Sequence, residues 1–274
     1  MMYNKAVPPT YLVFEDSTIW EYCCVHWGDY NETVITDNGD DTVNIVTTFK
    51  SMSNTTVKKS IVISEQNNVD NTGGTYTTGT TKEPVGITVK QCAAVTRFPN
   101  APNDVTDSNL PGITKFNEFK YFTGMLYSSA CAGMFWGQSS LVSVECPPIS
   151  WTSGSGLTVG CNGWFRNCGS LRHLVLPNMT NYTNYCFSSC GAEELDFSSN
   201  VAKITDFPRY NSNLKVVVCR ATTPPEMSSG QANAWPSTLE HIYVPAESID
   251  LYKAADVWST KASLITSIEG SDYE

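Results

Sequence analysis

The sequence predicts a mainly β protein with short helices, in which stacked repeat strands follow a small α+β N-terminal domain. A seven-residue phrase with apolar residues at positions 1, 4 and 6 occurs five times. A Thr- and Asn-rich segment with a hairpin signal interrupts the N-terminal part. Short stretches of helical periodicity flank both regions. Together these observations favour an irregular solenoid with an α+β domain before it.

The repeated phrase is clearest at residues 171–177, which read Leu-Arg-His-Leu-Val-Leu-Pro. The first positions of successive copies lie 30, 21, 22 and 25 residues apart. A period of about 20–29 residues with this apolar spacing is typical of leucine-rich repeats. One short strand cannot bury its inner face alone, so the copies are expected to stack. The inward residues are Leu141, Val144 and Cys146; Leu171, Leu174 and Leu176; Ala192, Leu195 and Phe197; Leu214, Val217 and Cys219; Leu239, Ile242 and Val244.

Three domains are expected along the chain. Residues 1–110 form an N-terminal α+β anchoring domain, with a Thr/Asn-rich β insertion at residues 29–84. Residues 111–245 form the leucine-rich-repeat solenoid. Residues 246–274 form a C-terminal helical cap and an acidic tail, because a terminal repeat needs a cover for its end face.

The first domain opens with alternating strand and helix signals. Residues 11–14 are apolar and predict a short buried strand. Asp16 or Ser17 can cap a helix that follows. One face of that helix is apolar at Ile19, Trp20, Cys23 and Trp27.

The insertion at residues 29–84 predicts a β-hairpin and a third strand. Residues 33–36 and 43–46 are the hairpin strands, joined through Asn38-Gly39. The third strand is expected at residues 57–63, and a long polar loop at residues 67–81.

Helices are also expected on both sides of the repeats. Thr88 can cap a helix over residues 89–95. After the fifth phrase, a helix places Ile249, Tyr252, Ala255 and Trp258 against the last repeat. Trp258→Ala is therefore expected to destabilise the C-terminal end.

The charge of the chain argues against some classes of binding partner. The formal net charge is -10 and the pI is about 4.8. Nucleic-acid binding through phosphates needs clustered Lys and Arg, so no nucleic-acid partner is expected. No apolar run approaches the roughly 18–20 residues that span a bilayer, so no membrane insertion is expected. The first residues lack signal-peptide form, which indicates either no export by this route or a signal already removed.

Three interpretations are open for the state of the ten cysteines. Free, buried thiols that pack as apolar groups are favoured. Disulfides are the second reading, since they form in oxidising compartments. The third is a zinc site made of Cys161, Cys168, Cys186 and Cys190, although tight C-x2-C pairs are missing. No cofactor is expected.

Several segments resemble BspA-like leucine-rich-repeat proteins, which occur in Bacteroidales surface proteins and in phages that infect these bacteria. The matching segments are Cys24-Val25, residues 91–96, residues 116–124 and residues 165–177. The resemblance covers roughly residues 10–28 and 85–270. In one departure, residues 29–84 replace a calcium-like loop of the family. Asp37, Asn38, Asp40 and Asp41 lack the ligand spacing and closing Glu of a calcium loop.

No catalytic constellation is apparent. The histidines are His26, His173 and His241, and the last two share position 3 of the phrase. Ser143 and Glu194 take the same position on other strands, but a triad needs a nucleophile and an acid beside the base. The chain is therefore expected to be no enzyme, and a hydrolase on a repeat scaffold is the weakest hypothesis.

Binding is the better hypothesis for the outer strand face. Positions 3 and 5 of each phrase point away from the core, because strand side chains alternate between faces. A merely solvated face is the alternative. The candidate ligand-binding residues are Ser143, Glu145, His173, Glu194, Asp196, His241 and Tyr243, beside Val175, Val216 and Val218.

The resemblance and the insertion together suggest a bacteriophage virion component, a head or tail fibre or a decoration protein. In this hypothesis residues 29–84 bind other virion proteins or a second copy of the chain, and the repeats bind a host surface polysaccharide or protein. The alternative is a secreted or surface-exposed bacterial adhesin with the same repeats.

Overall fold

The computed structural model describes residues 10–40, 42–51, 54–64, 78–95, 110–125, 133–148, 160–183, 185–204, 211–227 and 235–274. The chain divides into two compact units. The first comprises residues 1–13 and 17–92, and the second comprises residues 14–16 and 93–274. The fold mixes sheets with a few short helices. In the described ranges, no helix has the length and apolar character needed to cross a membrane.

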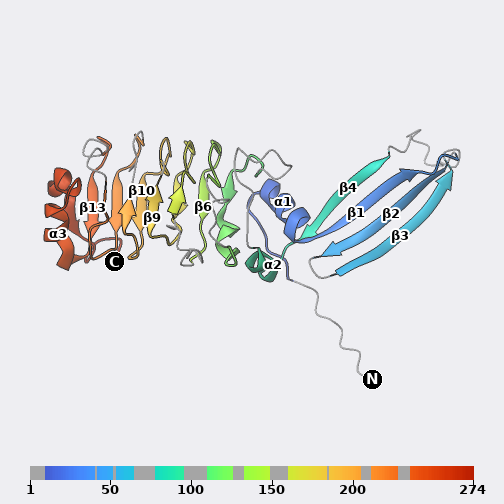
Figure 1. The fold of residues 1–274 in the computed structure, drawn as a ribbon, viewed down its shortest axis with the longest axis horizontal. Helices are drawn as coiled ribbons and strands as arrows, with labels where there is room; N and C mark the ends of the chain where they lie inside the picture. The colour runs from blue at the N-terminus through green and yellow to red at the C-terminus, as the bar shows by residue number, and fades with distance from the viewer. Residues whose placement is uncertain are drawn as a thin grey trace, which may run out of the picture. The chain divides into compact units, whose positions relative to one another are not determined.

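The first unit is built on a four-stranded antiparallel sheet with the order β3-β2-β1-β4 (Figure 1). The predicted hairpin and third strand are confirmed, and all three strands are longer than expected. Val34 lies opposite Val46 in the hairpin, and Gly39 turns the chain with a φ of +75°. The strands are β1 Asp29–Asp37, β2 Thr42–Ser51, β3 Asn54–Ser64 and β4 Gly79–Gly86.

Strand β4 was not predicted, because its first residues, 79–81, fall in the expected polar loop and the rest show no apolar alternation. It pairs with β1 at the edge of the sheet, and residues 79–83 are exposed. Backbone hydrogen bonds hold such a strand without an apolar alternation, so the polar pattern gave no strand signal. Pro84 fits an edge position, where no ladder amide is required. The rest of the expected loop, residues 67–77, lies outside the described residues.

Helix α1, Ser17–Trp27, confirms the first predicted helix. It buries Ile19 and Cys23, and it lies against β1 and β4. The strand expected at residues 11–14 is wrong, because these residues form separate contacts rather than a ladder. The Leu12 amide donates to the Ile87 carbonyl at 2.8 Å, whereas Val13 is 89% exposed.

Helix α2, Val89–Ala94, begins with the predicted cap. The Thr88 hydroxyl accepts from the Gln91 amide at 3.2 Å. In return, the Gln91 side-chain oxygen accepts from the Thr88 amide at 2.8 Å. This reciprocal pair is a capping box, which satisfies two amides that the first helical turn leaves free.

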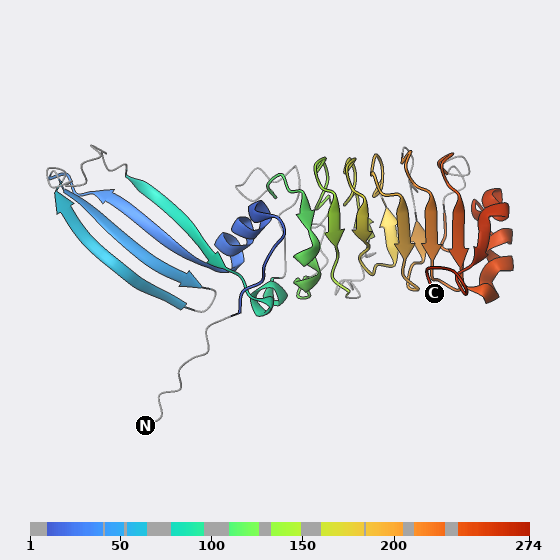
Figure 2. The same ribbon diagram turned by 180° about the vertical axis from the view of Figure 1, so that it is seen from behind.

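The second unit contains parallel strands at all five copies of the phrase. They stand side by side in one row (Figures 1 and 2). Pairing divides the row into two sheets with the orders β5-β6-β8 and β10-β12-β13-β14. The strands are β5 Lys115–Phe116, β6 Ser143–Glu145, β8 His173–Val175, β10 Glu194–Phe197, β12 Val216–Cys219, β13 His241–Val244 and β14 Ile265–Ser267.

A further parallel sheet, which was not predicted, has the order β11-β9-β7. Its strands have two or three residues each: β7 Gly160–Asn162, β9 Asn181–Thr183 and β11 Lys203–Ile204. Segments this short carry no alternation that sequence reasoning could detect. They are held by pairing with the equivalent segment of the next copy.

The core of the second unit is a row of stacked aromatic rings. The Phe135 and Phe165 rings are 5.7 Å apart, and the Phe165 and Phe187 rings are 6.0 Å apart. All three rings are essentially buried. Phe165 and Phe187 each stand three residues before a buried cysteine, so the repeat extends beyond the strand phrase. Beside β5, the 3-10 helix η2 Asn117–Tyr121 adds buried Phe119.

Residues 246–274, where a helical cap is expected, contain three short helices in place of one. These helices are η5 Ala246–Ser248, α3 Ile249–Ala254 and η6 Trp258–Leu264. Tyr252 and Trp258 are fully buried. The Tyr252 hydroxyl donates to the Ala221 carbonyl at 2.8 Å, and the Trp258 indole donates to the Pro225 carbonyl at 3.0 Å. Strand β14, which was not predicted, then pairs with β13.

Candidate functional site: the outer face of the parallel strands

The seven predicted site residues lie on β6, β8, β10 and β13. All seven pair in register with a neighbouring strand of the row: Ser143 with His173, Glu145 with Val175, Glu194 and His241 with Val216 on its two sides, and Asp196 and Tyr243 with Val218 on its two sides. His173, Glu194 and His241 are exposed, whereas Glu145, Asp196 and Tyr243 are half-buried. The expected outward direction therefore fits most of the candidate residues.

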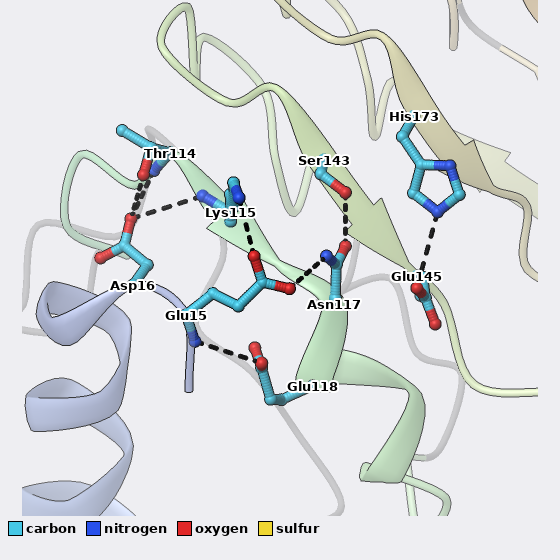
Figure 3. Close-up of polar contacts among 9 residues, drawn as sticks. All are labelled: Glu15, Asp16, Thr114, Lys115, Asn117, Glu118, Ser143, Glu145 and His173. Carbon is cyan, nitrogen blue, oxygen red and sulfur yellow. Dashed lines mark hydrogen bonds and ion pairs between the residues drawn. The ribbon is translucent and has the colours of Figure 1, made fainter. Parts of the chain in front are cut away.

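Ser143 is the exception, because it is buried and does not form part of an open face. Its hydroxyl donates to the Asn117 side-chain oxygen at 2.5 Å, at the first turn of η2 (Figure 3). Asn117 therefore covers Ser143 on β6. On the same face, Glu145 accepts from Lys120 at 2.7 Å and lies 3.5 Å from His173 Nε2.

A polar cluster ties residues 14–16 to the first strand of the row (Figure 3). The Asp16 carboxylate accepts from the Thr114 amide at 2.6 Å and from its hydroxyl at 2.7 Å. Glu15 pairs with the Lys115 ammonium at 2.7 Å, which lowers the pKa of the Glu15 carboxyl. These bonds hold Glu15 and Asp16 against β5 and the residue before it.

Glu118 is the unusual carboxyl of this cluster. One of its oxygens accepts from the Glu15 amide at 3.2 Å. Its other oxygen, Oε2, is buried and has no hydrogen-bond partner among the described residues. Burial raises the pKa of Glu118, because desolvation disfavours the charged form. A buried carboxyl with one unpaired oxygen costs stability at neutral pH.

The C-terminal residues cross the other end of the strand face. The Tyr273 ring lies 5.1 Å from the Tyr243 ring, and its hydroxyl donates to Glu194 at 2.7 Å. Tyr243 also stacks on His241 at 5.6 Å. Val218, expected to be exposed, is fully buried. Val218 pairs in register with Asp196 on β10 and with Tyr243 on β13, so Tyr273 lies over Val218.

Asp196 forms an ion pair with Arg220 on this face. The Arg220 guanidinium donates to both of its oxygens, with Nε at 2.9 Å and Nη2 at 2.9 Å. Nη2 also donates to the Tyr273 carbonyl at 3.0 Å. A two-pronged guanidinium–carboxylate pair of this kind holds both groups in a fixed orientation. The Asp196 carboxylate consequently presents its remaining lone pairs in a defined direction.

A hollow of about 420 Å³ opens between β8 and β10, where the row of strands divides into two sheets. Three of the predicted residues, His173, Glu194 and Asp196, line it. The other lining residues are Arg172, Leu174, Val175, Leu176, Asn178, Ser198 and Arg220. The structure thus brings part of the predicted face together around one concave site. Glu145, His241 and Tyr243 lie outside the hollow.

Arg172, Asn178, Ser198 and Arg220 were not among the candidates. Ser198 and Arg220 occupy position 7 of their phrases, directly after the inward residue of position 6. The other copies have Pro147, Pro177 and Pro245 at this position. A polar residue in place of the proline was therefore a signal that marked two residues of the hollow.

The nine described cysteines are buried and free. Burial raises the pKa of the Cys190 thiol to about 12 and that of Cys219 to about 11, so both stay protonated. The sulfur atoms of Cys161 and Cys186 are 2.6 Å apart, whereas Cys168 donates to the Phe135 carbonyl at 3.0 Å. Within the described ranges, no group of three or more Cys, His, Asp or Glu residues is placed to hold a metal ion. The zinc hypothesis gains no support from this geometry.

The candidate triad residues do not act on one another. The Ser143 hydroxyl donates to Asn117, His173 faces Glu145, and Glu194 accepts from Tyr273. The arrangement offers fixed donors and acceptors on an open face, which suits ligand binding.

Comparison with known proteins adds no relative: no family model matches the chain, and no curated protein matches it.

Proposed function

We propose that this chain is a non-enzymatic binding protein whose phrases form an irregular leucine-rich-repeat solenoid. The parallel register of the strands supports this proposal, because each phrase pairs with the equivalent residues of a neighbour at most boundaries. The stacked Phe135, Phe165 and Phe187 rings support it too, since they repeat at equivalent positions. Repeats that stack in this way present extended surfaces for ligands.

The observation that carries the binding role is the oriented polar face of the strand row. Arg220 and Tyr273 hold Asp196 and Glu194 in place, and His173 faces Glu145. Fixed polar groups of this kind lose little conformational entropy when a ligand arrives. A host surface polysaccharide is the ligand class that we propose for this face.

We place the protein in the virion of a phage that infects Bacteroidales, as a fibre or decoration protein. The resemblance to BspA-like proteins supports this host. The antiparallel sheet supports an attachment role, because β3 and β4 are long strands that form the edges of the sheet among the described residues, with backbone groups there open to pairing. A partner strand from another virion protein, or from a second copy, can add to such an edge.

Mass spectrometry of density-purified phage particles, beside the host surface fraction, tests the location. Stoichiometric presence in particles is expected. Presence in the host surface fraction alone would replace the virion role with that of a bacterial adhesin. A chain without residues 30–84 should fail to enter particles, and its normal incorporation would refute the attachment role of the sheet.

Retention of the purified full chain on immobilised host surface polysaccharide tests the ligand class. We expect retention that free polysaccharide competes away. Passage of the native chain through the column without delay would refute the polysaccharide ligand.

A further inference from the structure

The hollow between β8 and β10 exists because strand pairing stops at this boundary. At the next boundary, the Lys215 and Val216 amides both donate to the Glu193 carbonyl, at 2.8 and 3.1 Å. The equivalent bonds here would run from the Glu193 and Glu194 amides to the Arg172 carbonyl. Neither bond is formed within the described part of the chain. The edges of β8 and β10 therefore face each other without a ladder.

The Arg172 guanidinium occupies the boundary instead. Its Nη1 donates to the carbonyls of Gly169, Leu171 and Gly191, at 3.1, 2.9 and 2.8 Å. A Cβ at position 191 would lie 2.1 Å from this nitrogen and 2.2 Å from the Gly169 carbonyl oxygen. Only glycine leaves room for the guanidinium at this point. Arg172 and Gly191 thus meet at the edge of the opening.

The opening exposes apolar side chains that the other phrases bury. Positions 4 and 6 are buried in four of the five copies. In the copy on β8, Leu174 and Leu176 are only half-buried, and Val175 is 43% exposed. Exposed apolar surface costs about 25 cal/mol per Å², so an uncovered strip favours a ligand with an apolar face.

Polar groups surround this apolar strip. Asp196 keeps acceptor capacity beyond the Arg220 pair, because a carboxylate can accept about four hydrogen bonds. The Ser198 hydroxyl oxygen is buried and has no hydrogen-bond partner among the described residues. Asn178 adds an amide to the lining. The hollow therefore holds donors and acceptors beside an apolar surface.

The charges of the lining balance. Arg172 and Arg220 contribute +2, and Glu194 and Asp196 contribute -2, so the formal charges of these four side chains sum to zero. A site of this kind has no net attraction for an ion. A volume of about 420 Å³ also falls in the range of about 300–1,000 Å³ typical of small-molecule sites.

The opening is too narrow for an added peptide strand. A strand between β8 and β10 would need their backbones roughly 9.6 Å apart, twice the spacing of paired strands. Cα atoms of the two strands come within 8 Å of each other. The occupant is therefore a compact molecule that enters from the outer face.

We propose that this hollow binds one neutral sugar unit of a glycan. The hydroxyls of a sugar ring donate to Asp196 and exchange hydrogen bonds with Ser198 and Asn178, while the C–H face of the ring lies on Leu174 and Leu176. Arg172 is a positioning residue, since its guanidinium joins the two copies at the edge of the hollow. The inference rests on the proposed binding of surface polysaccharide and assigns that binding to one subsite.

Saturation-transfer NMR and calorimetry on the purified full chain test the site. The probes are methyl glucoside, methyl mannoside, methyl galactoside and N-acetylglucosamine, with glucuronic acid and glucosamine as charged counterparts. We expect at least one neutral probe to bind and both charged probes to bind more weakly. Binding of no neutral probe, or equal binding of charged probes, would overturn the proposal.

Two variants locate the binding. Asp196→Asn removes a charged acceptor and is expected to weaken binding by roughly tenfold or more. Val175→Trp fills the hollow without removing a polar group, so its binding should be lost while circular dichroism stays native. Asp250→Asn on exposed α3 is the matched control and should bind as the native chain does. Unchanged binding by Asp196→Asn and Val175→Trp would overturn the assignment.

The outcomes separate this inference from the proposed function. If both variants stay on the polysaccharide column like the native chain, the hollow is not the subsite, although the binding role stands. If the native chain binds a neutral probe through the hollow but passes the column, the sugar site stands and the polysaccharide ligand is wrong.

Discussion

The antiparallel sheet of the first unit and the parallel strands of the second are stabilised in different ways. Strands β1–β4 have eight to eleven residues, and most of their described side chains are half-buried or exposed. The parallel strands have two to four residues, but their inner side chains are mostly buried. The stability of the antiparallel sheet therefore depends on the backbone hydrogen bonds between its strands and on the turn at Gly39. The stability of the parallel strands depends on side chains that fill the space between copies.

The largest effect should follow from removing the cap of the parallel strands. Trp258→Ala leaves a cavity beside Tyr252 and an unpaired Pro225 carbonyl, so we expect a loss of roughly 3–5 kcal/mol in unfolding free energy. Chemical denaturation measures the loss. Hydrogen exchange should accelerate in β13 and β14. An unchanged midpoint would show that the cap does not stabilise these strands.

The same position in two phrases should respond differently. Leu195→Ala on β10 truncates a fully buried side chain and should cost roughly 2–5 kcal/mol. Leu174→Ala on β8 truncates a half-buried side chain beside the hollow and should cost roughly 1 kcal/mol. Denaturation of both variants measures the difference. Equal losses would mean that the hollow is closed in solution.

The antiparallel sheet should be sensitive at its turn. Gly39 has a φ of +75° in open space, so Gly39→Ala adds backbone strain of about 1 kcal/mol without a steric clash. Hydrogen exchange should accelerate in β1 and β2. Gly112→Ala, which also meets open space but needs no positive φ, is the control. Equal effects of the two substitutions would contradict a conformational origin.

The smallest effect concerns Glu118 and depends on pH. Its pKa is raised in the folded state, so the folded chain holds the proton more tightly than the unfolded chain. Stability from this group is present at low pH and is lost as the pH rises from the ordinary Glu value of 4.5 through the raised value. Glu118→Gln should therefore raise Tm by roughly 2–4 °C at pH 7.

That advantage of Glu118→Gln should disappear well below the ordinary Glu pKa of 4.5, where Glu118 is largely protonated in both states. Thermal scans of the native chain and the variant across this interval measure the difference. Exposed Glu240→Gln is the matched control and should show no such gap. A gap that persists at low pH would assign the effect to packing instead of charge.

Local pattern predicted the features that depend on neighbouring residues. The helix cap at Thr88, the hairpin at Gly39 and the strands of the five phrases all follow from short spacings. Edge strand β4 was not predicted, because its polar side chains face solvent while its backbone makes the contacts with β1. The strand predicted at the apolar residues 11–14 does not form, because these residues make several separate contacts instead.

The sequence by itself determined where the strands of each phrase lie and that Tyr252 and Trp258 cap them. Apolar spacing is a local property of the sequence. Only one orientation of each strand buries all the apolar residues of its phrase. Only the tertiary structure decided which outer residues form a site. Tyr273 reaches Glu194 across 79 residues, and Arg172 meets Gly191 across 19 residues. Such contacts depend on how copies stack, so no single phrase encodes the hollow between β8 and β10.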